Sequence, residues 1–267
     1  MGITVKNSIK LPVMGTFQFK KFSVVNERSA MKVNTDGVLL GAVMTINPED
    51  HRLLDVGTGT GTIALMAAQR LLSMREDSSC DKVSSAQQPI INAIDIDEPS
   101  ATEAALNFSN SPWSEYLKAY NMSLDQYSES LSENERFDLI FSNPPYFEDS
   151  LTAPDQRKST ARHTGDGLSY RDIFDFAVKR LSEKGRVAFV LPSDQETQLC
   201  RYARMSGLHL YRMTKIRTVP RKAPSRMIAE FSRERCQLPQ ENLVTIQDEG
   251  KYTSQYLSLM HDFYLFA

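Results

Sequence analysis

The stretch that decides the fold is Arg52-Leu-Leu-Asp-Val-Gly-Thr-Gly-Thr-Gly-Thr-Ile-Ala-Leu-Met66. Its first five residues, three of which are apolar, predict a buried strand, and residues 57–61 contain three glycines that allow a sharp turn. The residues after Gly61 are mostly apolar and predict a helix as far as Leu72. A buried strand that passes through a glycine-rich turn into a helix is the first unit of an α/β fold.

Further segments on the C-terminal side repeat this alternation of strands and helices. Strands are predicted at 89–94, 117–122, 137–142 and 186–191, with helices at 99–111 and 171–181. The alternation predicts a parallel sheet that helices cover on both faces. Three late strands near 208–218, 225–231 and 242–247, the last two as a hairpin-like pair, predict an added antiparallel edge.

The N-terminal region and one long polar segment complete the predicted architecture. Residues 1–50 are expected to form an extension with a strand or hairpin at 16–25 and a helix that begins at Thr35 or Asp36. Residues 73–89 are polar and aperiodic, which predicts a surface loop. We see no repeat and no linker, so residues 1–267 are expected to form a single domain.

Composition excludes several functional classes. The 267 residues contain 31 Lys and Arg against 33 Asp and Glu, a net charge of -2, which excludes a strongly basic protein that coats nucleic acid. The 3 cysteines form no CxxC pair, so neither a disulfide framework nor a metal site is expected. No signal peptide or membrane-spanning run is present in the sequence, so we expect a cytoplasmic protein that does not bind a membrane. We also expect no obligate protein partner.

The glycine turn and its neighbouring carboxylates indicate the type of ligand. No Lys-Ser/Thr pair follows the turn, and Thr62 breaks the dinucleotide spacing. Asp55 at the strand end disfavours a phosphate but suits an amine or a sulfonium, and S-adenosylmethionine carries both. Asp95, at the end of the next strand, is expected to bind the ribose hydroxyls. The predicted cofactor residues of this turn are Asp55, Gly57, Gly59, Gly61 and Asp95.

A second motif, Asn143-Pro-Pro-Tyr146, ends the strand at 137–142 and predicts the chemical site. The side-chain oxygen of Asn143 and the backbone oxygen of Pro144 can accept both N–H groups of an exocyclic amine. Pro144 and Pro145 would hold these acceptors rigidly. Tyr146 is expected to stack on a flat base, and Phe147 adds a second aromatic ring.

These motifs resemble class I S-adenosylmethionine-dependent methyltransferases of the N-methylating branch. The chain is more specifically similar to bacterial tRNA1(Val) adenine-37 N6-methyltransferases, through residues 31–41, 55–61, 143–147, 161–164, 219–221 and 226–231. The resemblance implies a Rossmann-like fold with a seven-stranded sheet and an antiparallel last strand, and N6-methylation of a tRNA adenine. It also implies cofactor contacts by Lys32, Thr35, Asp36, Asn143 and Ser123, the last where many relatives carry an aspartate that reads the adenine.

Basic residues between 212 and 235 predict a surface for RNA phosphates. Expected substrate contacts are Arg221, Lys222 and Arg226 in this region, with Arg162 and His163 in the loop after the second motif. Two alternatives stay open. The same Asn-Pro-Pro-Tyr motif could act on a glutamine side chain of a release factor, or the chain could bind RNA without turnover.

Overall fold

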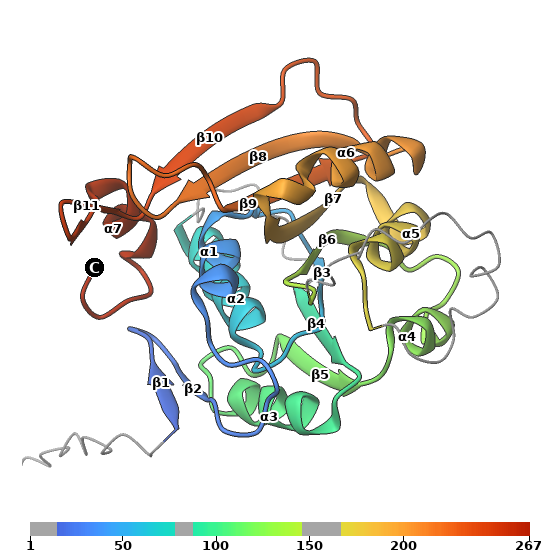
Figure 1. Cartoon of the computed structure of the whole chain (residues 1–267). Helices are drawn as coiled ribbons and strands as arrows, with labels where there is room; N and C mark the ends of the chain where they lie inside the picture. The colour runs from blue at the N-terminus through green and yellow to red at the C-terminus, as the bar shows by residue number, and fades with distance from the viewer. Residues whose placement is uncertain (1–14, 78–87, 146–166) are drawn as a thin grey trace, which may run out of the picture.

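The computed structural model describes residues 15–77, 88–145 and 167–267. Within these ranges the centre is an eight-stranded sheet of order β10-β8-β9-β7-β6-β3-β4-β5 (Figure 1). Its strands are β3 (Arg52–Val56), β4 (Ile90–Asp95), β5 (Leu117–Asn121), β6 (Phe137–Ser142), β7 (Leu181–Pro192), β8 (His209–Arg217), β9 (Arg226–Ser232) and β10 (Gln240–Thr245). Two short hairpins pair β1 (Thr16–Gln18) with β2 (Ser23–Val25) and β11 (Gln247–Asp248) with β12 (Lys251–Tyr252).

Helices cover both faces of the sheet, as the alternating pattern predicts. They are α1 (Thr35–Val43), α2 (Thr62–Asp77), α3 (Glu98–Ser109), α4 (Leu124–Ser130), α5 (Tyr170–Arg180), α6 (Glu196–Met205) and α7 (Ser254–Met260), with a 3₁₀ turn at Ser193–Gln195. One apolar core contains side chains of α1, α2, α3 and α7. The second contains side chains of α4, α5 and α6. The α/β prediction is therefore confirmed.

The central strands are buried on both sides, which explains why they contain consecutive apolar residues instead of a strict apolar and polar alternation. β3 lies between β4 and β6 in parallel, with Asp55 opposite Ala93 of β4 and Phe141 of β6. This register brings the carboxyl ends of β3, β4 and β6 to the same edge of the sheet. The glycine turn and the Asn-Pro-Pro segment follow two of these ends, so the fold places both motifs together.

The expected number of strands is wrong, because the sheet has eight strands rather than seven. The seventh strand in chain order, β9, runs antiparallel to its neighbours β7 and β8 as expected, and β10 is the additional strand. β10 pairs in parallel with β8 instead of forming a hairpin with β9. The hairpin is excluded because β9 already has a partner on each side.

The boundaries of two predicted segments also differ. Residues 73–77 belong to α2 rather than to a surface loop, because Arg75 donates hydrogen bonds from Nε to the Pro48 oxygen and from Nη2 to the Asp50 oxygen, which fixes the last turn of the helix. Residues 78–87 of that predicted loop lie outside the described residues. The N-cap of α1 is Asn34 and not Thr35 or Asp36, since Asn34 Oδ1 accepts from Gly37 N at 2.8 Å.

The predicted hairpin at 16–25 is confirmed, with Phe17 opposite Val24. It packs on the C-terminal segment, where the Phe19 and Tyr264 rings stack 5.9 Å apart and Lys20 N donates to Phe263 O. In the described ranges no helix is long and apolar enough to cross a membrane.

Candidate active site

The glycine turn after β3 requires glycine at three positions. Gly57, Gly59 and Gly61 have φ values of 72°, 57° and 79°, in the left-handed region that other residues rarely adopt. At Gly61 a side chain is also excluded, because a Cβ would lie 2.5 Å from the ring of Phe108 on α3. The turn therefore stays close to α3 and leaves its other side open.

Asp55 lies beneath this turn and is completely buried. Thr58 Oγ1 donates to Asp55 Oδ2 at 2.7 Å, so the carboxylate holds the start of the turn. Oδ1 completes no hydrogen bond with the described residues. Burial and the nearby charge of Asp95 raise the pKa of Asp55 to about 7, although the hydrogen bond from the Thr58 hydroxyl lowers it. A buried carboxylate with an unsatisfied oxygen is suited to a cationic group.

Asp95 links the end of β4 to the same turn. Its Oδ2 accepts from Gly59 N at 2.8 Å, and its Oδ1 accepts from Asp97 N at 2.9 Å. Burial raises the pKa of this half-buried carboxyl. Because each carboxylate oxygen has a second lone pair, Asp95 can still accept hydrogen bonds from the hydroxyl groups of a ligand.

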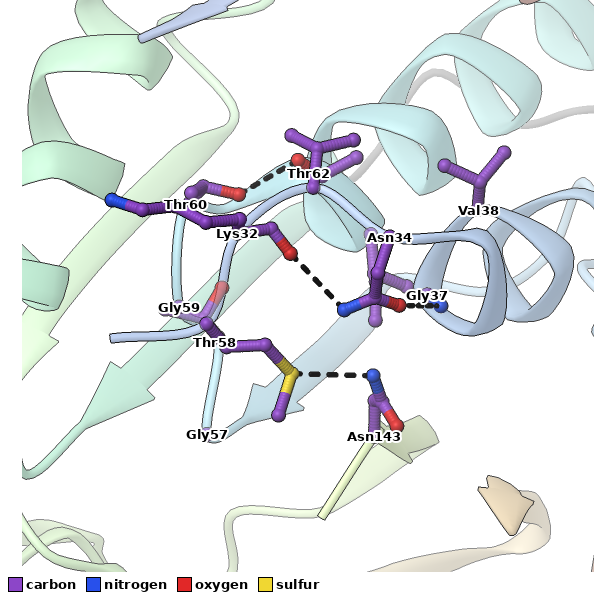
Figure 2. Close-up of a pocket in the computed structure, with 13 residues that line it drawn as sticks. Lys32, Asn34, Gly37, Val38, Gly57, Thr58, Gly59, Thr60, Thr62 and Asn143 are labelled. Carbon is purple, nitrogen blue, oxygen red and sulfur yellow. Dashed lines mark hydrogen bonds between the residues drawn. The ribbon is translucent and has the colours of Figure 1, made fainter. Parts of the chain in front are cut away.

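Asn143 lies at the tip of β6, across the pocket from the glycine turn (Figure 2). Ser142 Oγ donates to Val56 O at 2.6 Å, which ties the ends of β6 and β3 together. Asn143 and Pro144 are buried and Pro145 is exposed. The open pocket is lined by Met31, Lys32, Val33, Asn34, Gly37, Val38, Gly57, Thr58, Gly59, Thr60, Thr62, Ile63 and Asn143.

The wall of the pocket opposite β6 comes from residues 26–34, which connect β2 to α1 and are called the strap below. Glu103 on α3, which is 2% exposed, accepts the backbone N–H groups of Glu27, Arg28 and Ser29 at 2.9, 2.6 and 3.2 Å. A Cβ on Gly59 would lie 3.4 Å from Ser29 Oγ. The strap therefore runs directly against the glycine turn.

The structure brings part of the predicted cofactor set to this pocket. Lys32, Gly57, Gly59 and Asn143 line it, while Asp55, Gly61 and Asp95 shape the turn from behind. Thr35 and Asp36 are not among the lining residues. Asp36 instead accepts from Arg226 Nε at 2.8 Å. Ser123 is the N-cap of α4, where it forms a capping box with Gln126.

Several lining residues have no counterpart in the predicted set, notably Met31, Asn34 and the threonines of the turn. Asn34 had a recognisable signal, because asparagine is preferred over threonine at an N-cap. No sequence signal identified Met31, since its place in the pocket lining depends on where the strap lies in the fold. Tyr146, Phe147, Arg162 and His163 lie outside the described residues.

Most of the basic residues between 212 and 235 bind other parts of the chain. Arg212 pairs with the buried Glu230, and Lys215 pairs with Glu196. Hydrogen bonds to other residues of the chain are also donated by Arg217, Arg226 and Arg233. By contrast, Arg221 and Lys222 are exposed on the turn between β8 and β9. Because β8 runs parallel to β6, this turn lies at the same edge of the sheet as Asn143.

Comparison with known proteins identifies the family. Residues 43–220 match the model of the RMKL-like methyltransferase domain. A protein from Parabacteroides distasonis named tRNA1(Val) (adenine(37)-N6)-methyltransferase is 40% identical over 250 residues, 93% of this chain and 97% of that protein. A protein of the same name from Trichodesmium erythraeum is 37% identical, with 93% and 97% covered. The chain belongs to the tRNA1(Val) (adenine(37)-N6)-methyltransferase family.

The fold of this family member is also found in solved structures. A predicted O-methyltransferase from Agrobacterium tumefaciens superimposes with a TM-score of 0.59 over 85% of this chain and 96% of that protein, at 15% identity. At that identity the similarity concerns the fold, and it agrees with the parallel sheet described above. In the described residues no group of His, Cys, Asp and Glu side chains could hold a metal ion.

Proposed function

We propose that this protein transfers a methyl group from S-adenosylmethionine to N6 of an adenine in tRNA, with adenine 37 of tRNA1(Val) as the target. The observation that carries the proposal is the position of Asn143, whose carboxamide opens into the pocket formed by the glycine turn. The names of the relatives support the choice of RNA and nucleotide.

The pocket fits S-adenosylmethionine by its chemistry. Asp55 does not line the pocket, but its carboxylate is buried directly behind the glycine turn and would favour a cationic ligand there electrostatically. Asp95 can accept hydrogen bonds from the ribose hydroxyls, and Gly57 and Gly59 line the pocket. When bound, the cofactor supplies a methyl group on a positively charged sulfur.

The residues at the tip of β6 act on the target amine. The lone pair of an exocyclic amine is delocalised into the ring, which makes the nitrogen a weak nucleophile. Asn143 Oδ1 and the Pro144 carbonyl oxygen would accept hydrogen bonds from the two N–H groups of the target amine. These hydrogen bonds would favour a pyramidal nitrogen. These hydrogen bonds strengthen as positive charge develops, so they stabilise the transition state more than the ground state. No strong base is needed, because the N–H becomes acidic once nitrogen bonds to carbon.

Transfer to tRNA tests the proposal directly. The protein is incubated with labelled S-adenosylmethionine and unmodified tRNA transcripts, and the digested nucleosides are identified by mass spectrometry. We expect N6-methyladenosine at one position of tRNA1(Val). Label on a release factor supplied in parallel would favour the glutamine alternative. Cofactor binding without transfer to any substrate would favour a protein that binds RNA without turnover.

Substitution of Asn143 tests the assigned residue. Asn143→Ala should lower the rate by about 10²- to 10³-fold, the range for loss of one transition-state hydrogen-bonding group, and leave cofactor affinity nearly unchanged. The matched control is Asn242→Ala, an exposed asparagine on β10. Full turnover by Asn143→Ala would contradict the mechanism.

A further inference from the structure

The strap holds one side chain against the candidate catalytic residue. Asn143 Nδ2 donates a hydrogen bond to the thioether sulfur of Met31 at 3.4 Å, the contact that ends on the sulfur atom in Figure 2. The two residues are 112 positions apart in the sequence. Their meeting is therefore a property of the fold rather than of a local motif.

The backbone of Met31 is fixed independently of this contact. Its carbonyl oxygen accepts from Ser29 Oγ at 3.0 Å, and Ser29 Oγ accepts in turn from Ser100 Oγ on α3 at 3.1 Å. The same oxygen would lie 3.5 Å from a Cβ on Gly59. Because Glu103 binds the preceding strap amides, the sulfur is presented from an anchored segment.

The chemistry of the two groups gives the contact a direction. A carboxamide has an acceptor end and a donor end, and rotation by half a turn about its last bond exchanges them. A thioether sulfur can only accept a hydrogen bond. The contact with Met31 therefore favours the rotamer in which Nδ2 faces the strap, so that Oδ1 is directed elsewhere. An amine substrate needs this rotamer. In the opposite rotamer Nδ2 would face the N–H groups of the amine, so that two hydrogen-bond donors would meet.

We propose that Met31 is a positioning residue that selects the reactive orientation of the Asn143 carboxamide. This inference rests on the proposed function, because the acceptor end matters only if Asn143 binds an amine. Met31 does not touch the reacting atoms in this role. It removes the orientation in which Asn143 cannot accept the substrate N–H.

Two substitutions separate the acceptor from the shape of the side chain. Met31→Leu keeps an apolar side chain of similar volume without the sulfur, and Met31→Glu supplies an ionised carboxylate, which like the sulfur can only accept a hydrogen bond. We expect Met31→Leu to lower kcat about five- to tenfold, as for loss of one ordinary hydrogen bond, with the cofactor Kd changed less than about twofold. Met31→Glu should recover most of this loss in kcat. Met205→Leu, on an exposed methionine of α6, is the matched control and should behave as wild type.

A spectroscopic measurement tests the orientation without turnover. The side-chain amide signals of Asn143, assigned by their loss in Asn143→Ala, should shift or broaden in Met31→Leu and return toward the wild-type position in Met31→Glu. Unchanged signals in Met31→Leu, wild-type kcat in Met31→Leu, or equal losses in both Met31 variants would each overturn the inference. If the wild-type protein methylates no tRNA, the proposed function fails, and the amide signals still decide whether Met31 orients Asn143.

Discussion

Asp55 is a residue whose ionisation is strongly affected by the fold. Its pKa is about 7 because it is completely buried, compared with about 3.9 in an unfolded chain. Below about pH 4 it is protonated in both states, and its contribution to stability is fully present. As the pH rises from about 4 to about 7, the unfolded chain loses the proton first, so stability is lost over this window.

This shift predicts a pH dependence that one substitution removes. Between about pH 5.5 and pH 8 the free energy of unfolding of the ligand-free protein should fall by about 2 kcal/mol more than that of Asp55→Asn, which cannot ionise. Chemical denaturation at the two pH values measures this difference. Asp50, Asp95 and Glu230 also have raised pKa values, but they are present in both proteins and cancel. Parallel pH curves for the two proteins would contradict the assignment.

Gly61 combines a conformational and a steric requirement, and a second glycine separates the two. Gly61 and Gly207 have nearly equal φ values, 79° and 80°, but only at Gly61 would a Cβ meet another atom, the Phe108 ring. Gly207→Ala should therefore destabilise by about 1 kcal/mol. Gly61→Ala should destabilise by about 2 kcal/mol more, because the clash shifts α3 or the turn. Equal denaturation midpoints for the two variants would show that Phe108 moves away without strain.

At the scale of elements, α3 holds the strap in place through one carboxylate. Glu103→Gln leaves one acceptor oxygen for the backbone N–H groups of residues 27–29 and puts a donor against them. We expect a loss of about 2–4 kcal/mol in stability and about tenfold weaker cofactor binding. Glu98→Gln, exposed in the first turn of α3, is the matched control and should change stability by less than about 1 kcal/mol.

Hydrogen exchange locates the effect of the Glu103 substitution within the strap. The amides of residues 27–29 should exchange faster in Glu103→Gln than in Glu98→Gln, while the amides of β3 keep their protection. A uniform increase over the whole chain would indicate global destabilisation instead of release of the strap.

Elements whose signal is local could be predicted from the sequence, and elements defined by distant partners could not. β3, β4 and β6 are apolar runs that end at glycine, aspartate or Asn-Pro, so their position and their shared edge follow from pattern and topology. The sequence of β10 is compatible with pairing to either β9 or β8, so it does not identify the partner strand. Its partner is decided by the fact that β9 already has two neighbours.

The same distinction applies to the whole molecule and to its charges. The glycine turn and Asn143 were predictable as one site because both end parallel strands. The basic run at 212–235 indicated one continuous surface, but Arg226 binds Asp36, which is 190 positions away, and Arg212 binds the buried Glu230. Carboxylates this remote in sequence cannot be matched to their partners by pattern, so only the structure identifies which cations stay exposed.

We infer that Arg221 and Lys222, which are exposed at the edge of the sheet where Asn143 lies, contact tRNA phosphates. Their turn is held by Arg217, whose Nη1 donates to Pro220 O at 3.0 Å, and by Ser225 N, which donates to Ile216 O at 2.9 Å. With a net charge of -2 the protein as a whole does not attract RNA, so a local pair should contribute measurably.

The double variant Arg221→Ser/Lys222→Ser should weaken tRNA binding and reduce the slope of log Kd against log salt by about 2, as expected for the loss of two phosphate contacts. At saturating tRNA the kcat should stay within about twofold, because neither residue lines the pocket. The control Arg136→Gln/Lys184→Gln removes two exposed cations near the amino ends of β6 and β7, at the opposite edge of the sheet. Since both double variants change the net charge equally, an identical loss of affinity in the two would show that tRNA responds to overall charge, and that the turn between β8 and β9 is not its binding surface.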